Sequence, residues 1–273
     1  MATEAPSRIR AFISEDTGNM LSMEHVNVRI PDQQVATLFY IMGMGFTRDP
    51  YMNVGVDNMW INVGDQQFHL PTGGPQVLRG RGHVGIVVPS LAELTQRLDA
   101  VAPRLAGTKL SWRIEGPYLR VTCPWGNEFH CYEPAPEFGA AKMGIPYVEF
   151  SVPPGAAPGI ARFYETALQT PASAEGGVAT VEAGGIQRLV FREGANLPDY
   201  DGHHIAVYIN NFSEPYAYLS EHGLVTQEPA NHQLRFKDIA DPETGKVLFT
   251  IEHEVRSGRH AGYRRALVNR LLP

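Results

Sequence analysis

The sequence predicts an α+β protein in which one strand–helix–strand–strand–strand (βαβββ) unit occurs four times, and two observations support this prediction. Segments of alternating apolar residues that end in a turn begin at His25, His83, Tyr147 and His204, at a period of roughly 60 residues. An amphipathic run typical of a helix follows each segment. Because one helix covers only one face of its sheet, we expect the four units to pair into two half-open barrels, each around a cleft.

The first two units show the repeated order of elements most clearly. Gly43 and Gly45 end the first helix, and Gly64 and Asp65 form a hairpin turn. The elements expected for the first unit are a strand over 25–30, a helix over 35–42 and strands around Val54, at 59–63 and at 67–70. Those expected for the second unit are a strand over 83–88, a helix over 91–101 and strands at 110–114, 118–123 and 128–132.

The third and fourth units repeat this order less regularly. The elements expected for the third are a strand from Tyr147, a helix near 160–168 and a last strand at 186–192. Those expected for the fourth are a strand from His204, a helix near 215–222 and a last strand at 246–254.

The domain prediction joins consecutive units across a proline-containing linker. Residues 133–144 hold Pro134, Pro136 and Gly139, which makes this segment the best linker in the chain. The predicted divisions are an N-terminal arm (1–20), a first domain of two units (21–134), the linker (135–143), a second domain of two units (144–256) and a basic, roughly helical tail (257–273).

Composition narrows the class of protein. The formal net charge of −6 argues against a nucleic-acid-binding protein, which normally has a basic surface. With 273 residues, of which 43% are hydrophobic, the chain is long enough to bury a sizeable core. Its two cysteines, Cys123 and Cys131, do not form a CxxC motif and do not suggest an oxidising compartment. Neither a signal peptide nor a membrane span is expected, and a cytoplasmic location is the default prediction.

The repeated unit resembles that of the vicinal oxygen chelate superfamily, which includes glyoxalase I, extradiol ring-cleavage dioxygenases, fosfomycin-resistance proteins and bleomycin-binding proteins. The resemblance covers about residues 22 to 255. It rests on the strand openings at His25 and His83, on Leu38-Phe39-Tyr40 through Gly45-Phe46, on Gln67-Phe68-His69-Leu70, on Pro124-Trp125-Gly126-Asn127-Glu128-Phe129-His130 and on Arg162-Phe163-Tyr164. It implies the half-open barrel fold and leaves the reaction open, because the family hosts several chemistries.

The resemblance implies metal ligands on the first and last strands of each unit, facing the cleft. In the first half these positions are His25, His69, His83 and His130, which are also the only four histidines before residue 134. Strand alternation supports two of them, because Phe68 and Leu70 flank His69, and Phe129 and Cys131 flank His130. We therefore expect one divalent transition-metal ion in the first half, with Fe(II) favoured and Ni, Zn, Co or Mn as alternatives.

The second half provides an internal comparison. Its equivalent positions are Tyr147, Val190, His204 and Phe249, when Gly185 and Gly245 are taken as the last hairpin turns. Only His204 could ligate a metal there, and one ligand does not hold an ion. The sequence therefore predicts that the second half is a degenerate repeat that serves as scaffold, dimer contact or cover for the cleft.

The same alternation predicts which other side chains face the cleft. Arginines would neutralise an anionic substrate and aromatic rings would stack on a planar one. The residues expected to bind substrate are Asn27, Arg29, Trp60, Asn62 and Tyr132, and those expected to act in catalysis are Tyr118, Arg120 and Glu128. This set suits a small aromatic or anionic organic molecule as the partner, with neither nucleic acid nor membrane, and it is compatible with a homodimer.

The favoured function is an enzyme that chelates vicinal oxygens of this substrate on the metal and performs an Fe(II)- and O2-dependent C–C or ring cleavage. One alternative is a glyoxalase-like lyase or isomerase that uses Ni, Zn or Co, with Glu128 or Tyr118 carrying the proton. Another is a non-catalytic protein that binds or sequesters a small molecule. Four imidazoles in an octahedral field leave two positions open, which favours an enzyme.

Overall fold

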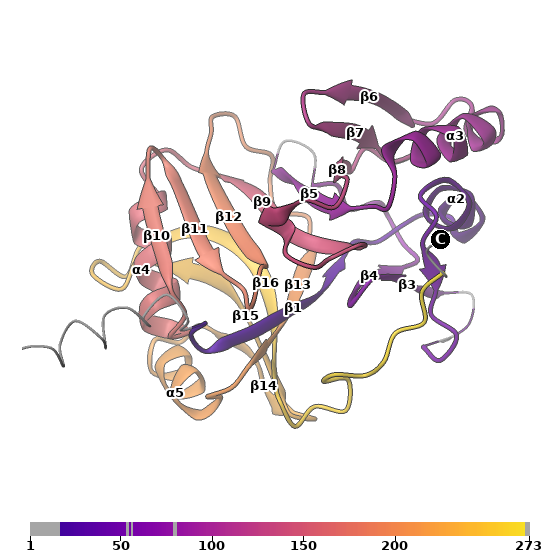
Figure 1. The fold of residues 1–273 in the computed structure, drawn as a ribbon. Helices are drawn as coiled ribbons and strands as arrows, with labels where there is room; N and C mark the ends of the chain where they lie inside the picture. Colours follow the sequence, from indigo (N-terminus) through magenta and orange to yellow (C-terminus); the bar gives the residue numbers. More distant parts are fainter. Residues whose placement is uncertain (1–16, 53–54, 56, 79–80, 271–273) are drawn as a thin grey trace, which may run out of the picture.

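Four βαβββ units follow one another along the chain in this computed structural model, which describes residues 17–52, 55, 57–78 and 81–270 (Figure 1). The first unit consists of β1 (Met20–Asn27), α2 (Gln33–Ala36), the π-helical segment η2 (Thr37–Gly43), β2 (Thr47–Arg48), β3 (Asn58–Val63) and β4 (Gln66–Pro71). The second consists of β5 (Gly82–Val87), α3 (Leu91–Val101), η3 (Ala102–Leu105), β6 (Ser111–Glu115), β7 (Tyr118–Thr122) and β8 (Glu128–Tyr132). The strand expected around Val54 lies outside the described residues.

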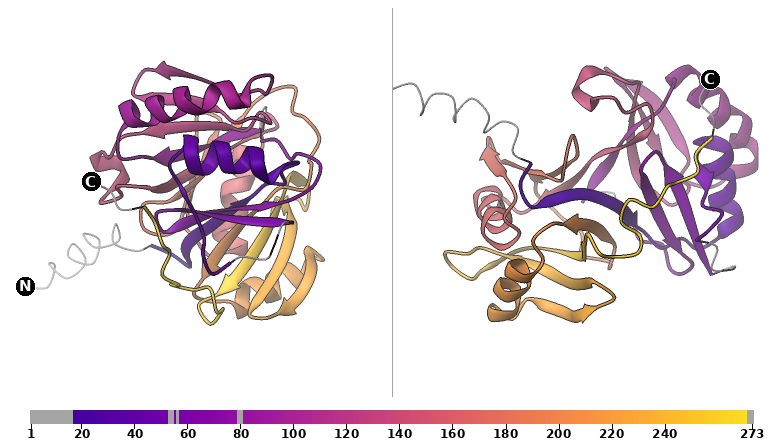
Figure 2. Two further views of the ribbon diagram at one scale, coloured as in Figure 1. Left: turned by 90° about the vertical axis from the view of Figure 1, so that its right-hand side faces the viewer. Right: turned by 60° about the horizontal axis from the view of Figure 1, so that its bottom comes forward.

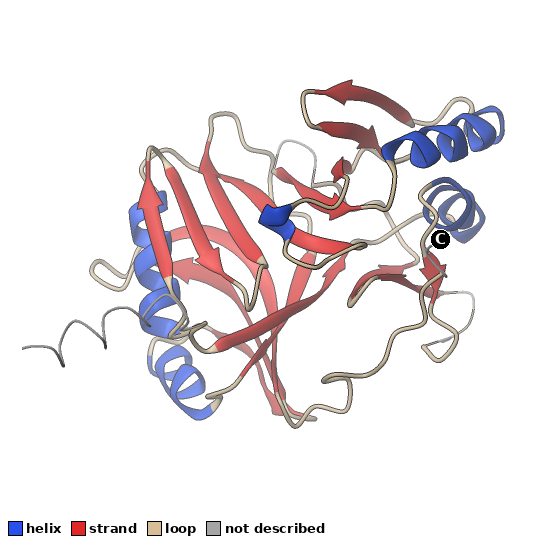
Figure 3. Cartoon of the chain, in the orientation of Figure 1, coloured by secondary structure: helices blue, strands red, loops and turns tan. Residues whose placement is uncertain are grey.

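The second half repeats the order after a short helical turn, η4 (Pro136–Phe138), in the predicted linker. The third unit consists of β9 (Gly144–Val152), α4 (Ala157–Ala167), β10 (Ala172–Glu175), β11 (Val178–Glu182) and β12 (Arg188–Glu193). The fourth consists of β13 (His204–Ile209), α5 (Ser213–Glu221), β14 (Val225–Ala230), β15 (Gln233–Ala240) and β16 (Val247–Ser257). The helices lie on the outer faces of the sheets (Figure 3), so the α+β class and the fourfold repeat are confirmed.

The units pair across the sheets in a different way from the sequence-based expectation. One eight-stranded sheet has the order β14-β15-β16-β13-β1-β4-β3-β2, and the other has the order β10-β11-β12-β9-β5-β8-β7-β6. The antiparallel contacts of β1 with β13 and of β5 with β9 therefore join the first unit to the fourth and the second to the third. The first strand of each unit leaves one edge open for pairing with the first strand of another unit. The order of the units along the chain does not determine which two of these strands pair.

Consecutive units in the first half meet through their helices instead. A methyl group at Gly43 would lie 3.2 Å from Cγ2 of Val101, so η2 and α3 approach closely there. The rings of Phe39 and Phe129 stack at 5.9 Å between centroids in the core behind the two sheets. This buried apolar packing holds the first two units, residues 21–134, together, although their sheets do not pair.

Residues 258–270, which we call the C-terminal tail, do not form the helix that the sequence suggested. The tail consists of turns and irregular backbone, and it runs from the end of β16 past β1 to the first unit (Figures 1 and 2). Asn62 Nδ2 donates to the carbonyl of Val268 at 2.8 Å, and Asn269 Nδ2 donates to that of Gly64 at 2.8 Å. These tertiary bonds replace the backbone bonds of a helix. Among the described residues, none of the helices is both long and apolar enough to span a bilayer.

Candidate metal centre

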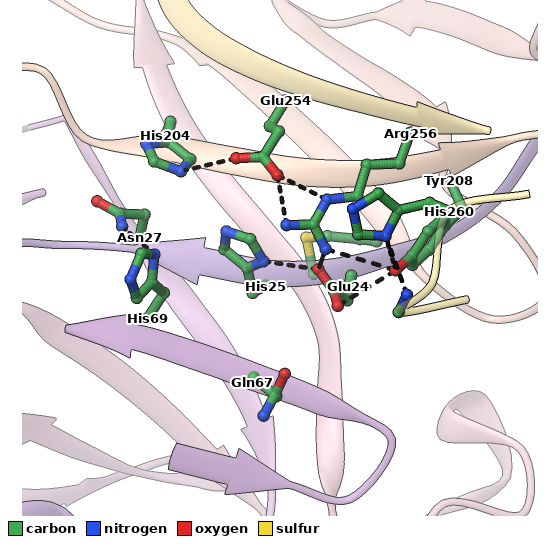
Figure 4. A network of polar contacts seen from close by, with 12 residues as sticks. Glu24, His25, Asn27, Gln67, His69, His204, Tyr208, Glu254, Arg256 and His260 are labelled. Carbon is green, nitrogen blue, oxygen red and sulfur yellow. Dashed lines mark hydrogen bonds and ion pairs between the residues drawn. The ribbon is translucent and has the colours of Figure 1, made fainter. Parts of the chain in front are cut away.

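Three histidines from three neighbouring strands meet between the first and fourth units, in what we call the first cleft (Figure 4). His25 lies on β1, His69 on β4 and His204 on β13, and one ring nitrogen of each lies within 4.8 Å of the others. The ring centroids are 5.6 Å apart for His25 and His69, 5.6 Å for His25 and His204 and 6.5 Å for His69 and His204. The pairing of the first unit with the fourth therefore creates the cluster.

Strand register explains why these side chains share one face. Asn27 is the register partner of His69 across β1–β4 and of His204 across β1–β13. His25 is two residues before Asn27, and alternate residues of a strand point to the same face. On β4, Phe68 and Leu70 are buried on the opposite face, which is the one that the helices cover. The central strand β1 thus brings ligands from both of its neighbours to its own histidine.

Each imidazole has a partner on Nδ1, while no hydrogen bond from the described chain reaches its Nε2. Glu24 Oε2 accepts a hydrogen bond from His25 Nδ1 at 2.7 Å, and Asn27 Nδ2 lies 2.6 Å from His69 Nδ1. Glu252 Oε1 lies 3.5 Å from His204 Nδ1. The three Nε2 atoms are buried and lack a hydrogen-bond partner within the described chain. Metal-ligating histidines typically donate from one nitrogen to an outer partner and turn the other to the ion, as His25 does here. His69 takes this form when the Asn27 amide is turned over, so that its Oδ1 accepts from Nδ1.

A carboxylate completes the cluster from β16. Glu254 pairs with Ala206 in register, as His69 pairs with Asn27, so it holds the position equivalent to His69 in the fourth unit. Its Oε2 lies 3.7 Å from His204 Nε2, and the residue is only 3% exposed. Three imidazoles and one carboxylate form a donor set that suits a divalent transition metal.

Electrostatics keep these donors in the state that a metal needs. Burial, together with the nearby His25, lowers the pKa of His69 to about 3, and burial also lowers the pKa of His204. Burial opposes ionisation of Glu254, but His25, Arg256 and Arg235 together lower its pKa. At neutral pH His69 and His204 are therefore uncharged and Glu254 is ionised, which are the charge states that metal binding requires.

His204 and Glu254 are not in the predicted ligand set. His204 is left out because it is the one possible ligand at the equivalent positions of the second half, and one ligand does not hold an ion. The last position is assigned to Phe249 because it is counted from the turn at Gly245, whereas β16 is 11 residues long and pairs with β15 through two register shifts. The signal for His204 was present, because it opens its unit as His25 does.

The other two predicted ligands lie in the second cleft, between the second and third units, so the four histidines do not form one site. The rings of His83 and His130 stack at 3.6 Å between centroids, and Glu128 lies close enough to complete a group of three donors. His130 Nε2 donates to Glu128 Oε1 at 3.0 Å, and His83 Nε2 lies 3.0 Å from the hydroxyl of Tyr147. Unlike those of the first cleft, these Nε2 atoms already have partners.

The remaining predicted site residues divide between the two clefts. Asn27, Trp60 and Asn62 lie in the first, where the Trp60 ring stacks on His69 at 3.9 Å between centroids. Arg29 is exposed and lies 3.5 Å from the carbonyl oxygen of Asp201, away from the centre. The residues found in the second cleft are Tyr118, Arg120, Glu128 and Tyr132, with Tyr118 stacked on His130 and Arg120 paired with Glu128.

Comparisons with known proteins bear on the fold. No family model and no curated protein matches the sequence. A glyoxalase I mutant from Zea mays has a similar structure, with a TM-score of 0.60 and 15% identity over 93% of this chain and 98% of that one. A proposed dioxygenase from Bacillus subtilis has a TM-score of 0.56 and 16% identity, over 88% of this chain and 86% of that one. The cppA protein of Streptococcus pneumoniae has a TM-score of 0.53 and 9% identity, over 89% of this chain and 100% of that one.

These similarities, together with the paired βαβββ units, identify the fold. The chain has the vicinal oxygen chelate fold, as the sequence resemblance implied. At these levels of identity the similarity establishes the fold, and the chemistry must be argued from the residues of the first cleft.

Proposed function

We propose that the protein is a metal-dependent enzyme that binds two neighbouring oxygens of a small organic substrate in the cleft between its first and fourth units. The observation that carries this proposal is the convergence of three buried Nε2 atoms that lack a hydrogen bond within the described chain, from His25, His69 and His204, beside the carboxylate of Glu254. These four residues would hold one divalent ion, with Fe(II) as the leading candidate and Ni, Zn, Co or Mn as alternatives.

A bound ion would supply a Lewis acid for the substrate oxygens and, in the case of iron, a redox centre. Four protein ligands leave two positions of an octahedral field, which is enough for a bidentate chelator. Because only Glu254 among the ligands is anionic, the site keeps a net positive charge with a divalent ion and favours ionised substrate oxygens.

The surrounding residues fix the ligands and exclude water. Glu24 accepts from Nδ1 of His25, so Nε2 is the nitrogen of this ring that an ion would bind. Arg256 pairs with Glu24 and with Glu254, which holds both carboxylates in place. The Trp60 ring covers one face of His69 and closes that side of the cleft. Rigid outer partners of this kind keep a metal site in its productive geometry.

The donor set favours oxidative cleavage over proton transfer. A glyoxalase-like isomerase needs a base at the metal, but Glu254 bonds to two arginines and has a lowered pKa, which makes it a weak base. Tyr118 and Glu128, the proton carriers suggested by the sequence, lie in the other cleft. We therefore favour an extradiol-type dioxygenase, with a glyoxalase-like lyase as the alternative.

The test loads the protein with Fe(II) under anaerobic conditions, adds catechol and then admits oxygen. We expect catechol to bind, as measured by calorimetry, and then oxygen consumption and a yellow ring-opened product. His204→Ala should abolish all three effects, whereas His83→Ala should leave them in place. Parallel samples with Ni, Co or Zn and a hemithioacetal measure the isomerase alternative.

Two results would overturn this assignment. Binding of catechol by the Fe(II) protein without its cleavage, together with no turnover of the hemithioacetal by the Ni, Co or Zn protein, would favour a sequestering protein over an enzyme. Failure of the wild-type protein to bind any of these metals, or equal metal content in wild type and His204→Ala, would remove the site itself.

A further inference from the structure

A cavity of about 870 Å³ lies at the end of the sheet that contains β1, and none of the proposed metal ligands lines it. Its walls come from the turn between β14 and β15, from the segment after β13 and from the start of the C-terminal tail. The backbone N–H of Ser257, at the end of β16, donates to the carbonyl of His232 in that turn at 2.9 Å, so the turn and the tail lie side by side (Figure 1). The volume is within the range of small-molecule sites.

The lining of this cavity is basic, although the chain as a whole has a formal net charge of −6. The side chains of His232, Arg259 and Arg264 line it, and no aspartate or glutamate does so among the described residues. None of the three forms an ion pair within the described part of the chain, whereas the nearby Arg256 pairs with Glu254. Basic side chains that no acidic group neutralises attract an anion.

Two of these basic residues have a backbone conformation that is unfavourable for residues with a side chain. The φ angle is +63° at His232 and +53° at Arg264, in the left-handed region where glycine costs least. Asn231 and His232 form the two-residue turn between β14 and β15, a place where Asn-Gly is the favoured pair. Local structure therefore does not explain the histidine or the arginine. Non-glycine residues in such conformations cluster at ligand sites.

Aromatic rings lie beside these basic groups. Phe212 and Tyr263 line the same cavity. The guanidinium carbon of Arg264 lies 5.3 Å from the centroid of the Tyr263 ring, and that ring packs against Tyr208 on β13 at 5.1 Å between centroids. A cavity that combines rings with basic groups suits a planar organic anion better than a bare inorganic ion.

We propose that this cavity binds a phosphomonoester of a planar organic molecule, with its phosphate at His232, Arg259 and Arg264 and its ring against Phe212 and Tyr263. A phosphomonoester has three acceptor oxygens and a charge of about −1.5 to −2 at neutral pH, which matches three basic side chains better than a single carboxylate does. The site is separate from the first cleft, so this inference does not depend on the metal or on the proposed reaction.

The test is calorimetric titration of phenyl phosphate, benzoate and inorganic phosphate into the full-length protein after removal of metal, so that no ion competes for the phosphate. We expect phenyl phosphate to bind at least about tenfold more tightly than either of the other two probes. His232→Gly and Arg264→Gly should each weaken its binding by at least about tenfold, the usual effect of losing a charge-assisted hydrogen bond. Both variants should keep or raise the midpoint of urea denaturation, because glycine adopts this backbone conformation without strain.

Two matched controls separate this site from general effects of backbone and charge. Asn196→Gly changes another exposed residue with a left-handed φ of +57°, and Arg270→Gln removes an exposed arginine of the same tail, and neither residue lines this cavity. Both should bind phenyl phosphate as the wild type does. Equal affinity in the wild type and Arg264→Gly, an equal loss in Arg270→Gln, or no binding by the wild type at millimolar concentration would overturn the site. A lower midpoint of denaturation in both glycine variants would also overturn it, because the side chains would then serve the fold.

Discussion

The rings of His25 and His204 lie 5.6 Å apart, although these residues open the first and the last of the four units. Their approach follows from the antiparallel pairing of β1 with β13, in which His25 faces Ala206 and Asn27 faces His204. An ion held by both would cross-link the two ends of the chain through the middle of one sheet. Metal binding at this place should therefore stabilise the folded protein as well as supply its chemistry.

The first prediction concerns which histidine retains the metal. His204→Ala removes one of the three unpartnered Nε2 donors, so bound metal after dialysis should fall to a small fraction of the wild-type content. His83→Ala should retain at least most of the metal, because His83 lies in the other cleft and already bonds to Tyr147. Elemental analysis of protein purified without chelators measures both. Retention by His204→Ala together with loss by His83→Ala would place the metal in the second cleft.

Local patterns in the sequence were sufficient to predict the units but not their pairing. The helix over 91–101 and the strand over 128–132 coincide with α3 and β8, because capping and alternation are local properties. The pairing of strand edges from different units depends on contacts between residues far apart in the chain. The period of the apolar pattern in one sequence carries no information on these contacts. The expected domain of residues 21–134 therefore contains His25 and His69 but neither His204 nor Glu254.

The sequence pattern predicts on which face of its strand a candidate site residue lies, but not which residues lie near it in the fold. Alternation correctly placed His69 with Trp60, and His130 with Tyr118, on cleft faces. It gave no information on whether His69 and His83 share a cleft, and they do not. Glu254 was missed because the register shifts between β15 and β16 move the count from the preceding turn, and such irregularities leave no periodic signal.

A second prediction uses the stacking of Trp60 on His69. An open-shell ion such as Co(II) or Cu(II) quenches a nearby excited indole, and Trp60 contacts a proposed ligand ring directly. Titration of the metal-free protein should therefore quench part of the tryptophan fluorescence with a one-to-one endpoint. Trp60→Phe should lose most of this change but still bind the ion, whereas Trp112→Phe, in the second unit, should retain it. Quenching that persists in Trp60→Phe would place the ion elsewhere.

A third prediction concerns Glu254 and its two arginines. Glu254→Gln leaves the half-buried charge of Arg235 and the buried charge of Arg256 without this anion, and it removes the proposed carboxylate ligand. Breaking a buried ion pair costs about 3–5 kcal/mol, so we expect a loss of unfolding free energy of that order, together with weaker metal binding. Chemical denaturation and metal titration measure the two effects.

Glu243→Gln is the control for this variant. Glu243 is 67% exposed and pairs with Arg162 at 3.5 Å, and an exposed pair contributes about 0–1 kcal/mol. Similar losses in both variants would mean that the Glu254 network contributes no more to stability than a surface pair.

The last prediction concerns the share of the acid-induced loss of stability that His83, in the second cleft, contributes. Burial and the neighbouring His130 lower the pKa of His83 to about 4 from its usual 6.5. Below pH 6.5 the unfolded chain gains a proton at this residue that the folded chain does not, so stability falls as the pH falls, until the folded form also titrates near pH 4. Between pH 7 and pH 5 this amounts to about 2 kcal/mol for one histidine.

His83→Gln should therefore reduce the difference in unfolding free energy between pH 7 and pH 5 by about this amount, because an amide does not titrate and still reaches the hydroxyl of Tyr147. Urea denaturation of the metal-free protein at the two pH values measures the difference. The exposed residue His222 provides the control, and His222→Gln should leave the pH dependence as it is in the wild type. If His83→Gln and the wild type lose equal stability between pH 7 and pH 5, then the second cleft admits a proton in the folded state and His83 is not held neutral there.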